Sequence, residues 1–126
     1  MPHLTIEYSS NMEARVDMAL MCDVLRRAAI ATGVLPMAGV RVRAICATHI
    51  SIADGGADHG FIDISVRLRG GRDLATRKAA TTQIFDAARD FLTPAMATYS
   101  IALSFEMRDI DPELSPKTGT IRDHLT

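Results

Sequence analysis

The chain has 126 residues, of which 48% are hydrophobic, and its formal net charge at pH 7 is −1. This length fits a single domain, and the hydrophobic content supports a core and excludes global disorder. The near-neutral charge offers no electrostatic grip on nucleic acid or on a membrane surface. Trp is absent and aromatic residues make up 5%, which argues against a platform for stacking bases.

Targeting and metal-binding signals are missing from the sequence. No apolar stretch approaches the ~20 residues of a membrane span, and the first residues contain His and Glu where a signal peptide would need an apolar run. Cys22 and Cys46 lie among apolar neighbours without metal-type spacing, so we expect free, buried thiols in a cytoplasmic protein. The four histidines show no paired metal spacing, and the chain contains no phosphate loop, dinucleotide fingerprint or GxSxG. We therefore expect neither a metal nor a cofactor.

The first stretch, Met1-Pro2-His3-Leu4-Thr5-Ile6-Glu7-Tyr8, alternates apolar and polar residues after the proline. This alternation predicts a half-buried strand. If Met1 is removed, the ring nitrogen of Pro2 becomes a free secondary amine. An α-amino group titrates near pH ~8, and burial or a nearby cation lowers that value. Pro2 is thus a candidate general base near neutral pH, although this stretch alone favours an ordinary proline that starts a strand.

The rest of the first half predicts a helix and a second strand. A turn-type cluster at 9–11 precedes a helical stripe over 17–32, which Gly33 and Pro36 bring to an end. Residues 40–52 alternate again, with Val42 and Ala44 on the same side. The segment 54–58, Asp-Gly-Gly-Ala-Asp, is the clearest loop and divides the chain near its middle.

The second half repeats the order of elements. Residues 61–69 alternate cleanly, and Gly70-Gly71 break the pattern. Asp73 is a good N-cap for a helix that we expect to run to about Leu92, with Pro94 near its end. Residues 99–107 form the last predicted strand, and 113–126 form a polar, irregular arm.

Together these elements predict one α+β domain built from two β-α-β units, 1–58 and 59–112, with the C-terminal arm 113–126. Each helix can connect two parallel strands, so we expect one four-stranded mixed sheet with both helices on one face. The other face would carry Arg41, Arg43, Ile45 and Phe61, a mixture too apolar for plain solvent. Because no third layer remains in the chain, a partner subunit is expected to cover it.

Three arginines are candidates for binding an acid, because the guanidinium fork holds a carboxylate bidentately and keeps its charge. Arg41 and Arg43 lie on the helix-free face near the start of the second strand. Arg72 lies in a turn beside a helix N-terminus, which itself favours an anion. Arg43 could instead form an interface salt bridge, and Arg72 could be a solvated turn residue. The remaining arginines considered are interpreted as surface charges: Arg67, Arg69, Arg77 and Arg89.

The sequence resembles the tautomerase superfamily, whose members use an N-terminal proline as general base or acid. Within it, the resemblance is closest to the 5-carboxymethyl-2-hydroxymuconate Δ-isomerases of bacterial homoprotocatechuate degradation. The similar stretches run in order through nearly the whole chain: 2–7, 31–43, 53–55, 71–74 with Arg77, and 102–106.

The resemblance implies roles for these residues. Pro2 matches the proline base, and Arg41 matches a second-strand arginine that binds a substrate carboxylate. The turn at Arg72 resembles a Gly-Arg turn that follows the first strand in single-unit members; here it occurs only in the second half. Each half then retains part of a site. The family forms trimers of two-unit chains, which implies one site per chain, with Arg72 a candidate to reach it across a subunit boundary.

The implied activity is a cofactor-free isomerisation of 5-carboxymethyl-2-hydroxymuconate, a small polyanionic carboxylate, by a homotrimer. Two alternatives stay open. A protein of the same fold could act on another acid, such as phenylpyruvate, or hydrate or decarboxylate small unsaturated acids. It could also be a trimeric interaction module with a vestigial site.

Overall fold

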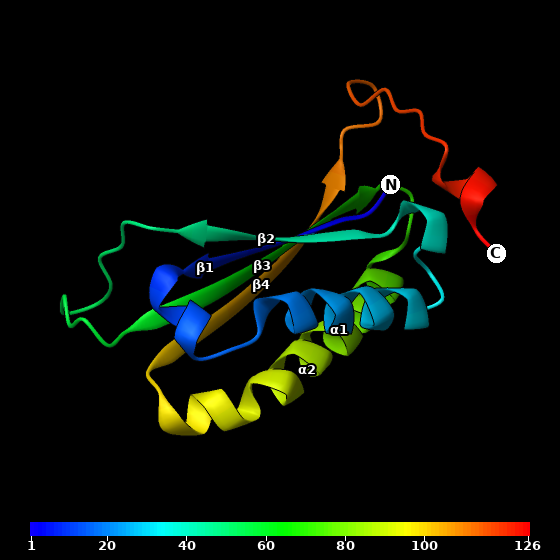
Figure 1. Ribbon diagram of the computed structural model, residues 1–126. Helices are drawn as coiled ribbons and strands as arrows, with labels where there is room; N and C mark the ends of the chain where they lie inside the picture. Colours follow the sequence, from blue (N-terminus) through cyan, green and yellow to red (C-terminus); the bar gives the residue numbers. More distant parts are fainter.

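The computed structural model describes residues 1–126 and consists of a four-stranded sheet with two helices packed on one face (Figure 1). The strands and long helices are β1 His3–Ser9, α1 Met18–Ala31, β2 Arg41–Ala47, β3 Gly60–Arg69, α2 Leu74–Thr98 and β4 Ile101–Ile110. Three short 3-10 helices complete the chain: η1 Ser10–Ala14, η2 Met37–Gly39 and η3 Ile121–His124.

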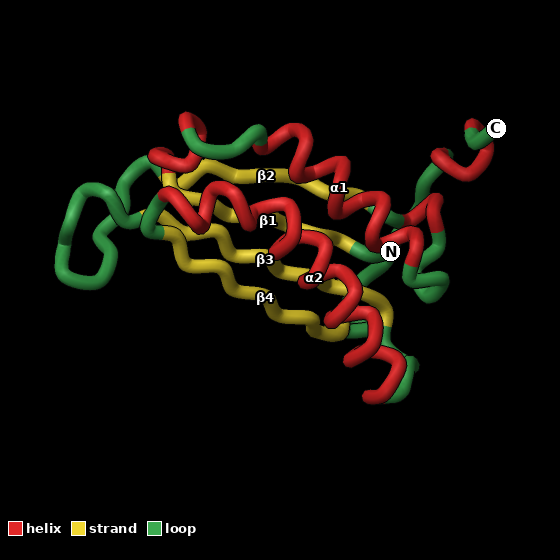
Figure 2. Tube along the Cα trace, turned by 90° about the horizontal axis from the view of Figure 1, so that it is seen from below, coloured by secondary structure: helices red, strands yellow, loops and turns green.

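The strand order is β2-β1-β3-β4. β1 pairs with β2 and β3 with β4 in parallel, whereas the central pair β1 and β3 is antiparallel. Figure 2 shows α1 and α2 crossing the same face of this sheet. The predicted mixed sheet with two helices on one face is therefore confirmed.

The core lies between the sheet and the helices, where alternate strand residues meet the apolar stripes of α1 and α2. Leu4 and Ile6 of β1, and the even-numbered residues 62–68 of β3, are buried. From the helices, the core receives Met18, Met21, Leu25, Ala29, Ile84, Ala88 and Leu92. This is the pattern that the two sequence periods predicted, since strand residues two apart and helix residues three or four apart share a face.

The helix-free face carries the odd-numbered residues of β1, β2 and β3, and all of them except Ser9 at the end of β1 are at least partly exposed. Ile45 is half exposed there, and no segment of the chain forms a third layer. Most residues of the opposite parity pack on the helices, so this face is the side of the sheet that the chain itself leaves uncovered.

Several predicted boundaries were wrong. α2 does not end near Leu92 but continues through Pro94 to Thr98. Pro94 has no backbone N–H, so the helix loses the one hydrogen bond that this residue would donate. The later bonds persist, and the Tyr99 N–H donates to the Ala95 carbonyl at 2.8 Å. β2 ends at Ala47 rather than residue 52.

The last strand was also misplaced by a few residues. β4 begins at Ile101 and reaches Ile110, so Tyr99 does not join the apolar face of the strand. Its ring instead lies 4.7 Å from the guanidinium carbon of Arg15, a cation–π contact.

The expectation of two buried thiols was wrong for one of them. Both cysteines are free, Cys22 being half-buried and Cys46 exposed. Cys46 lies near the end of the edge strand β2. No helix of the structure is long and apolar enough to cross a membrane.

Candidate functional site

Pro2 is buried directly before β1. Its carbonyl accepts a hydrogen bond from the Arg41 N–H at 3.3 Å, which continues the β1–β2 ladder to the chain end. The ring packs on η2: a Cβ added at Gly39 would lie 2.9 Å from Pro2 Cδ. Pro2 is therefore held between β2 and η2, and η2 has room for the proline ring because residue 39 is a glycine.

A cavity of about 730 Å³ opens beside this proline, and we call it the Pro2 pocket. Besides Pro2, it is lined by segments from η2, the end of β3, the turn before α2 and the C-terminal arm. Every ionisable side chain among its lining residues is a cation. These cations are Arg41, Arg69, Arg72, Lys117 and Arg122. Such a cavity favours a ligand with several negative charges.

Arg41 reaches the Pro2 pocket with unused donors. Its Nε atom is buried and has no hydrogen-bond partner, and its Nη2 atom has only the Met1 sulfur, at 3.8 Å. A buried donor without a partner costs free energy. A carboxylate entering the pocket would satisfy it and pair with the positive charge.

Arg72 lines the same pocket, but its guanidinium also holds the fold together. Nε and Nη2 donate to the Val34 carbonyl at 3.2 and 2.8 Å, and Nη1 donates to the Arg69 carbonyl at 2.8 Å. It is thus not a merely solvated turn residue. Within one chain, Arg72 already faces the same cavity as Pro2 and Arg41, without help from a second subunit.

Arg43 lies elsewhere. It is exposed on the helix-free face, and its Nη1 lies 3.2 Å from His3 Nδ1. It is absent from the lining of the Pro2 pocket. Burial, followed by the charges of Arg67 and Arg43, lowers the pKa of His3, so the neutral imidazole can accept the hydrogen bond from Arg43.

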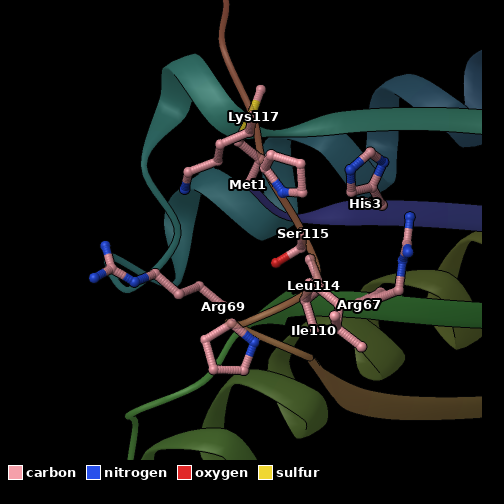
Figure 3. A pocket seen from close by; sticks show the side chains of 10 residues that line it. Met1, His3, Arg67, Arg69, Ile110, Leu114, Ser115 and Lys117 are labelled. Atoms are coloured by element: carbon pink, nitrogen blue, oxygen red, sulfur yellow. The ribbon is translucent and has the colours of Figure 1, made fainter.

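A second cavity of about 580 Å³ adjoins the first on the His3 side. Figure 3 shows Met1 and Lys117 side by side, with His3 and Arg67 to one side and Arg69 to the other. Three residues line both cavities: Met1, Arg69 and Lys117. The two hollows are therefore neighbours that meet at the chain's first residue.

The electrostatics at the chain end follow from this crowd of cations. Burial lowers the pKa of the Met1 α-amine, and the adjacent Lys117 lowers it further. Arg41 and Arg69 act in the same direction. Each positive neighbour disfavours a second positive charge, so an amine at this end of the molecule is biased toward its neutral form.

Sequence reasoning missed Arg69, Lys117 and Arg122. Arg69 was interpreted as a surface charge, yet the antiparallel register pairs His3 with Arg67 and so brings the end of β3 beside the start of β1. That pairing could have indicated Arg69. Nothing in the sequence of the arm indicated that it returns to the N-terminus, as Figure 1 shows.

The corresponding position of the second half, the start of β3, lines neither of these two cavities. Gly60 is buried where β3 begins, and a Cβ there would lie 2.9 Å from both Asn11 Oδ1 and Met12 Sδ. Beside it, His59 bonds Asp54 through Nε2 at 2.8 Å and Ser100 through Nδ1 at 2.7 Å. The η1 residues and this hydrogen-bonded chain fill the space that the Pro2 end leaves open.

A sequence profile described as 5-carboxymethyl-2-hydroxymuconate isomerase matches residues 2–125. The chain belongs to this family. The 5-carboxymethyl-2-hydroxymuconate Delta-isomerase of Escherichia coli is 28% identical over 121 residues, covering 96% of each chain. A crystal structure of a 5-carboxymethyl-2-hydroxymuconate delta-isomerase is 32% identical, covers 98% of this chain and 92% of its own, and superposes with a TM-score of 0.93.

More distant solved structures share the fold of this chain. A fused 4-OT protein solved as a symmetric trimer shares the fold at 17% identity, with coverage of 92% and 93% and a TM-score of 0.67. Membership of the 5-carboxymethyl-2-hydroxymuconate isomerase family makes this chain an isomerase of the tautomerase superfamily.

Proposed function

We propose that this isomerase acts on 5-carboxymethyl-2-hydroxymuconate in homoprotocatechuate catabolism, with Pro2 as general base after removal of Met1 and without a cofactor. One observation carries the proposal. A buried proline at the start of the chain opens on a cavity whose ionisable side chains are all cations. The name shared by the family and its relatives supports the choice of substrate.

The same cations would tune the base. Burial and Lys117 lower the pKa of the amine that now ends the chain, that of Met1. With Met1 removed, the Pro2 nitrogen becomes the terminal amine in the same surroundings. We expect its pKa to be lowered for the same reasons, which would favour the neutral form in which a general base acts.

The proposed reaction moves one proton. The Pro2 nitrogen accepts a proton from the substrate 2-hydroxy group or an acidic carbon, and the electron pair shifts along the conjugated chain. The resulting prolinium returns the proton to a carbon further along, which leaves substrate and enzyme balanced. Arg41, through its unpaired Nε, would hold a carboxylate and stabilise the developing negative charge.

The other two candidate arginines take different parts in the proposal. Arg72 would supply charge to the pocket while its three hydrogen bonds keep the turn in place. Arg43 points to the helix-free face with His3, where it would contribute to substrate binding only from a site completed by a partner subunit. We propose a homotrimer on the basis of that uncovered face and of the trimeric fused 4-OT relative.

The test compares three forms of the protein: the processed chain, a form that retains Met1 as verified by intact mass, and Pro2→Ala. Isomerisation of 5-carboxymethyl-2-hydroxymuconate is followed in the ultraviolet. Loss of the secondary amine should lower kcat/KM by about 10²–10⁴-fold. Full activity in the Met1-retaining form would refute the mechanism, and turnover of phenylpyruvate alone would refute the substrate.

A further inference from the structure

We infer that the C-terminal arm is part of the binding site, and that Lys117 together with Arg69 forms a second carboxylate subsite that restricts this isomerase to polycarboxylates. This inference rests on the proposed function, because it names the feature of the substrate that the site selects. We call the pair Arg69 and Lys117 the junction subsite, since both residues line the two adjoining cavities.

The position of the arm carries the first part of the argument. After β4 ends at Ile110, residues 112 and 114–117 line the smaller cavity, and 117–119 with 121 and 122 line the Pro2 pocket. Gly119 comes within contact of the Met1 side chain, a Cβ there lying 4.0 Å from Met1 Cε. The arm thus forms a wall of both hollows and presents Lys117 where they meet.

The charges carry the second part. The ion pairs of the structure join Arg26 and Arg27 to Asp23, His59 to Asp54, and Arg89 to Asp86. None of them involves Arg69, Lys117 or Arg122, so these three side chains have no acidic partner within the chain. The arm and its approach contain carboxylates, such as Asp111 and Glu113, but no Asp or Glu lines either cavity. Unpaired cations that repel one another are stabilised by a bound anion.

The spatial order of the cations supplies the third part. Arg41 lies in the Pro2 pocket but not in the smaller cavity, whereas Arg67 lines only the smaller one. The junction subsite lies between them. An acid with one carboxylate at Arg41 would therefore direct a second carboxylate toward Arg69 and Lys117, past the proline. A monocarboxylate can occupy only one of these positions.

The decisive variant is Lys117→Gln, and the chain offers a matched control in Lys78→Gln, because Lys78 is the only other lysine and is exposed on α2. Binding of tricarballylate, an unreactive tricarboxylate, is measured by calorimetry beside binding of a monocarboxylate, propionate. In Lys117→Gln, the loss of one charged hydrogen-bonding partner should weaken tricarballylate binding about 10-fold or more and leave propionate binding unchanged. In Lys78→Gln, the binding of both acids should equal that of the wild type.

Kinetics give an independent readout. In Lys117→Gln, KM for 5-carboxymethyl-2-hydroxymuconate should rise while kcat stays nearly constant, since the subsite binds ground state and transition state alike. Phenylpyruvate turnover, where measurable, should not change. The inference is overturned if Lys117→Gln binds tricarballylate as the control does, or if mono- and tricarboxylate binding weaken equally.

The calorimetry also separates this inference from the proposed function. If the processed wild type does not isomerise the hydroxymuconate but binds tricarballylate in a Lys117-dependent way, the subsite stands and the proposed chemistry fails. If isomerisation depends on Pro2 while tricarballylate binding is indifferent to Lys117, the chemistry stands and the subsite fails.

Discussion

Replacing Gly39 by Ala tests whether the close packing of η2 on Pro2 positions the proline. The new Cβ would lie 2.9 Å from Pro2 Cδ and 3.5 Å from Met1 Cα. Ordinary contact begins at about 3.4 Å, so either the ring or the turn must move by roughly 0.5 Å. The atom in conflict, Pro2 Cδ, belongs to a rigid proline ring, which cannot rotate away as a flexible side chain would.

The size of the effect follows from that displacement. Overpacking a buried site costs about 1–3 kcal/mol, and misplacing a reacting group by ~1 Å can lower the rate about 10²-fold. For Gly39→Ala we expect a lower melting temperature and a loss of roughly 10-fold in kcat with little change in KM, since the arginines of the pocket are not displaced.

The assay pairs thermal unfolding with isomerase kinetics, and Gly119→Ala is the matched control. Gly119 lines the same pocket, but its added Cβ meets only Met1 Cε, at 4.0 Å, so both stability and kcat should stay near those of the wild type. Wild-type stability and kcat in Gly39→Ala would show that Pro2 is not held by this turn and would refute the reasoning.

Three further predictions concern stability and pH. Arg72→Ala removes three hydrogen bonds to two backbone carbonyls and should lower the free energy of unfolding by about 1–3 kcal/mol, measured with urea, whereas the exposed Arg43→Ala should change it little. Asp73 caps α2, and the hydrogen bond from the Thr76 N–H lowers the pKa of its carboxyl from 3.8. The stabilisation that the ionised Asp73 carboxylate gives is therefore complete above that ordinary value and is lost as the pH falls through the lower folded pKa. The urea midpoint of the wild type should exceed that of Asp73→Asn at neutral pH and converge with it in strong acid. A difference between the two midpoints that does not change with pH would contradict this. Ile64→Ala empties a fully buried position at the centre of the sheet and should cost about 2–5 kcal/mol, again by urea unfolding.

The fold was predictable because its periodicities are clear and agree with one another. The alternation in β3 and the helical stripe ending at Leu92 both mark the same core. Element ends were less predictable, as at Pro94, because tertiary packing and the remaining hydrogen bonds outweigh the loss of one N–H. The turn residues of the second half, Gly70 and Asp73, gave the start of α2 correctly.

The candidate site was only partly accessible to the same reasoning. Pro2 and Arg41 could be singled out because a strand alternation and a family resemblance pointed to them. The structure places both in the lining of one pocket, and their roles stay predictions. Lys117 and Arg122 could not, because an irregular arm has no period from which its path can be read. Arg72 shows a related limit: the sequence marks a turn arginine but not the carbonyls that it binds.

The burial of Pro2 has a consequence for biosynthesis. Pro2 is enclosed by the β2 ladder and by η2, so a peptidase that cleaves the bond between Met1 and Pro2 meets a proline held in place once the sheet has formed. β1 acquires its first neighbour only after β2 has been synthesised, up to Ala47, which at ~5–20 residues per second leaves a window of at least ~2–10 s. Maturation of the proposed base would then proceed most easily during synthesis, and a chain refolded with its initiator residue in place should be processed more slowly than a nascent one.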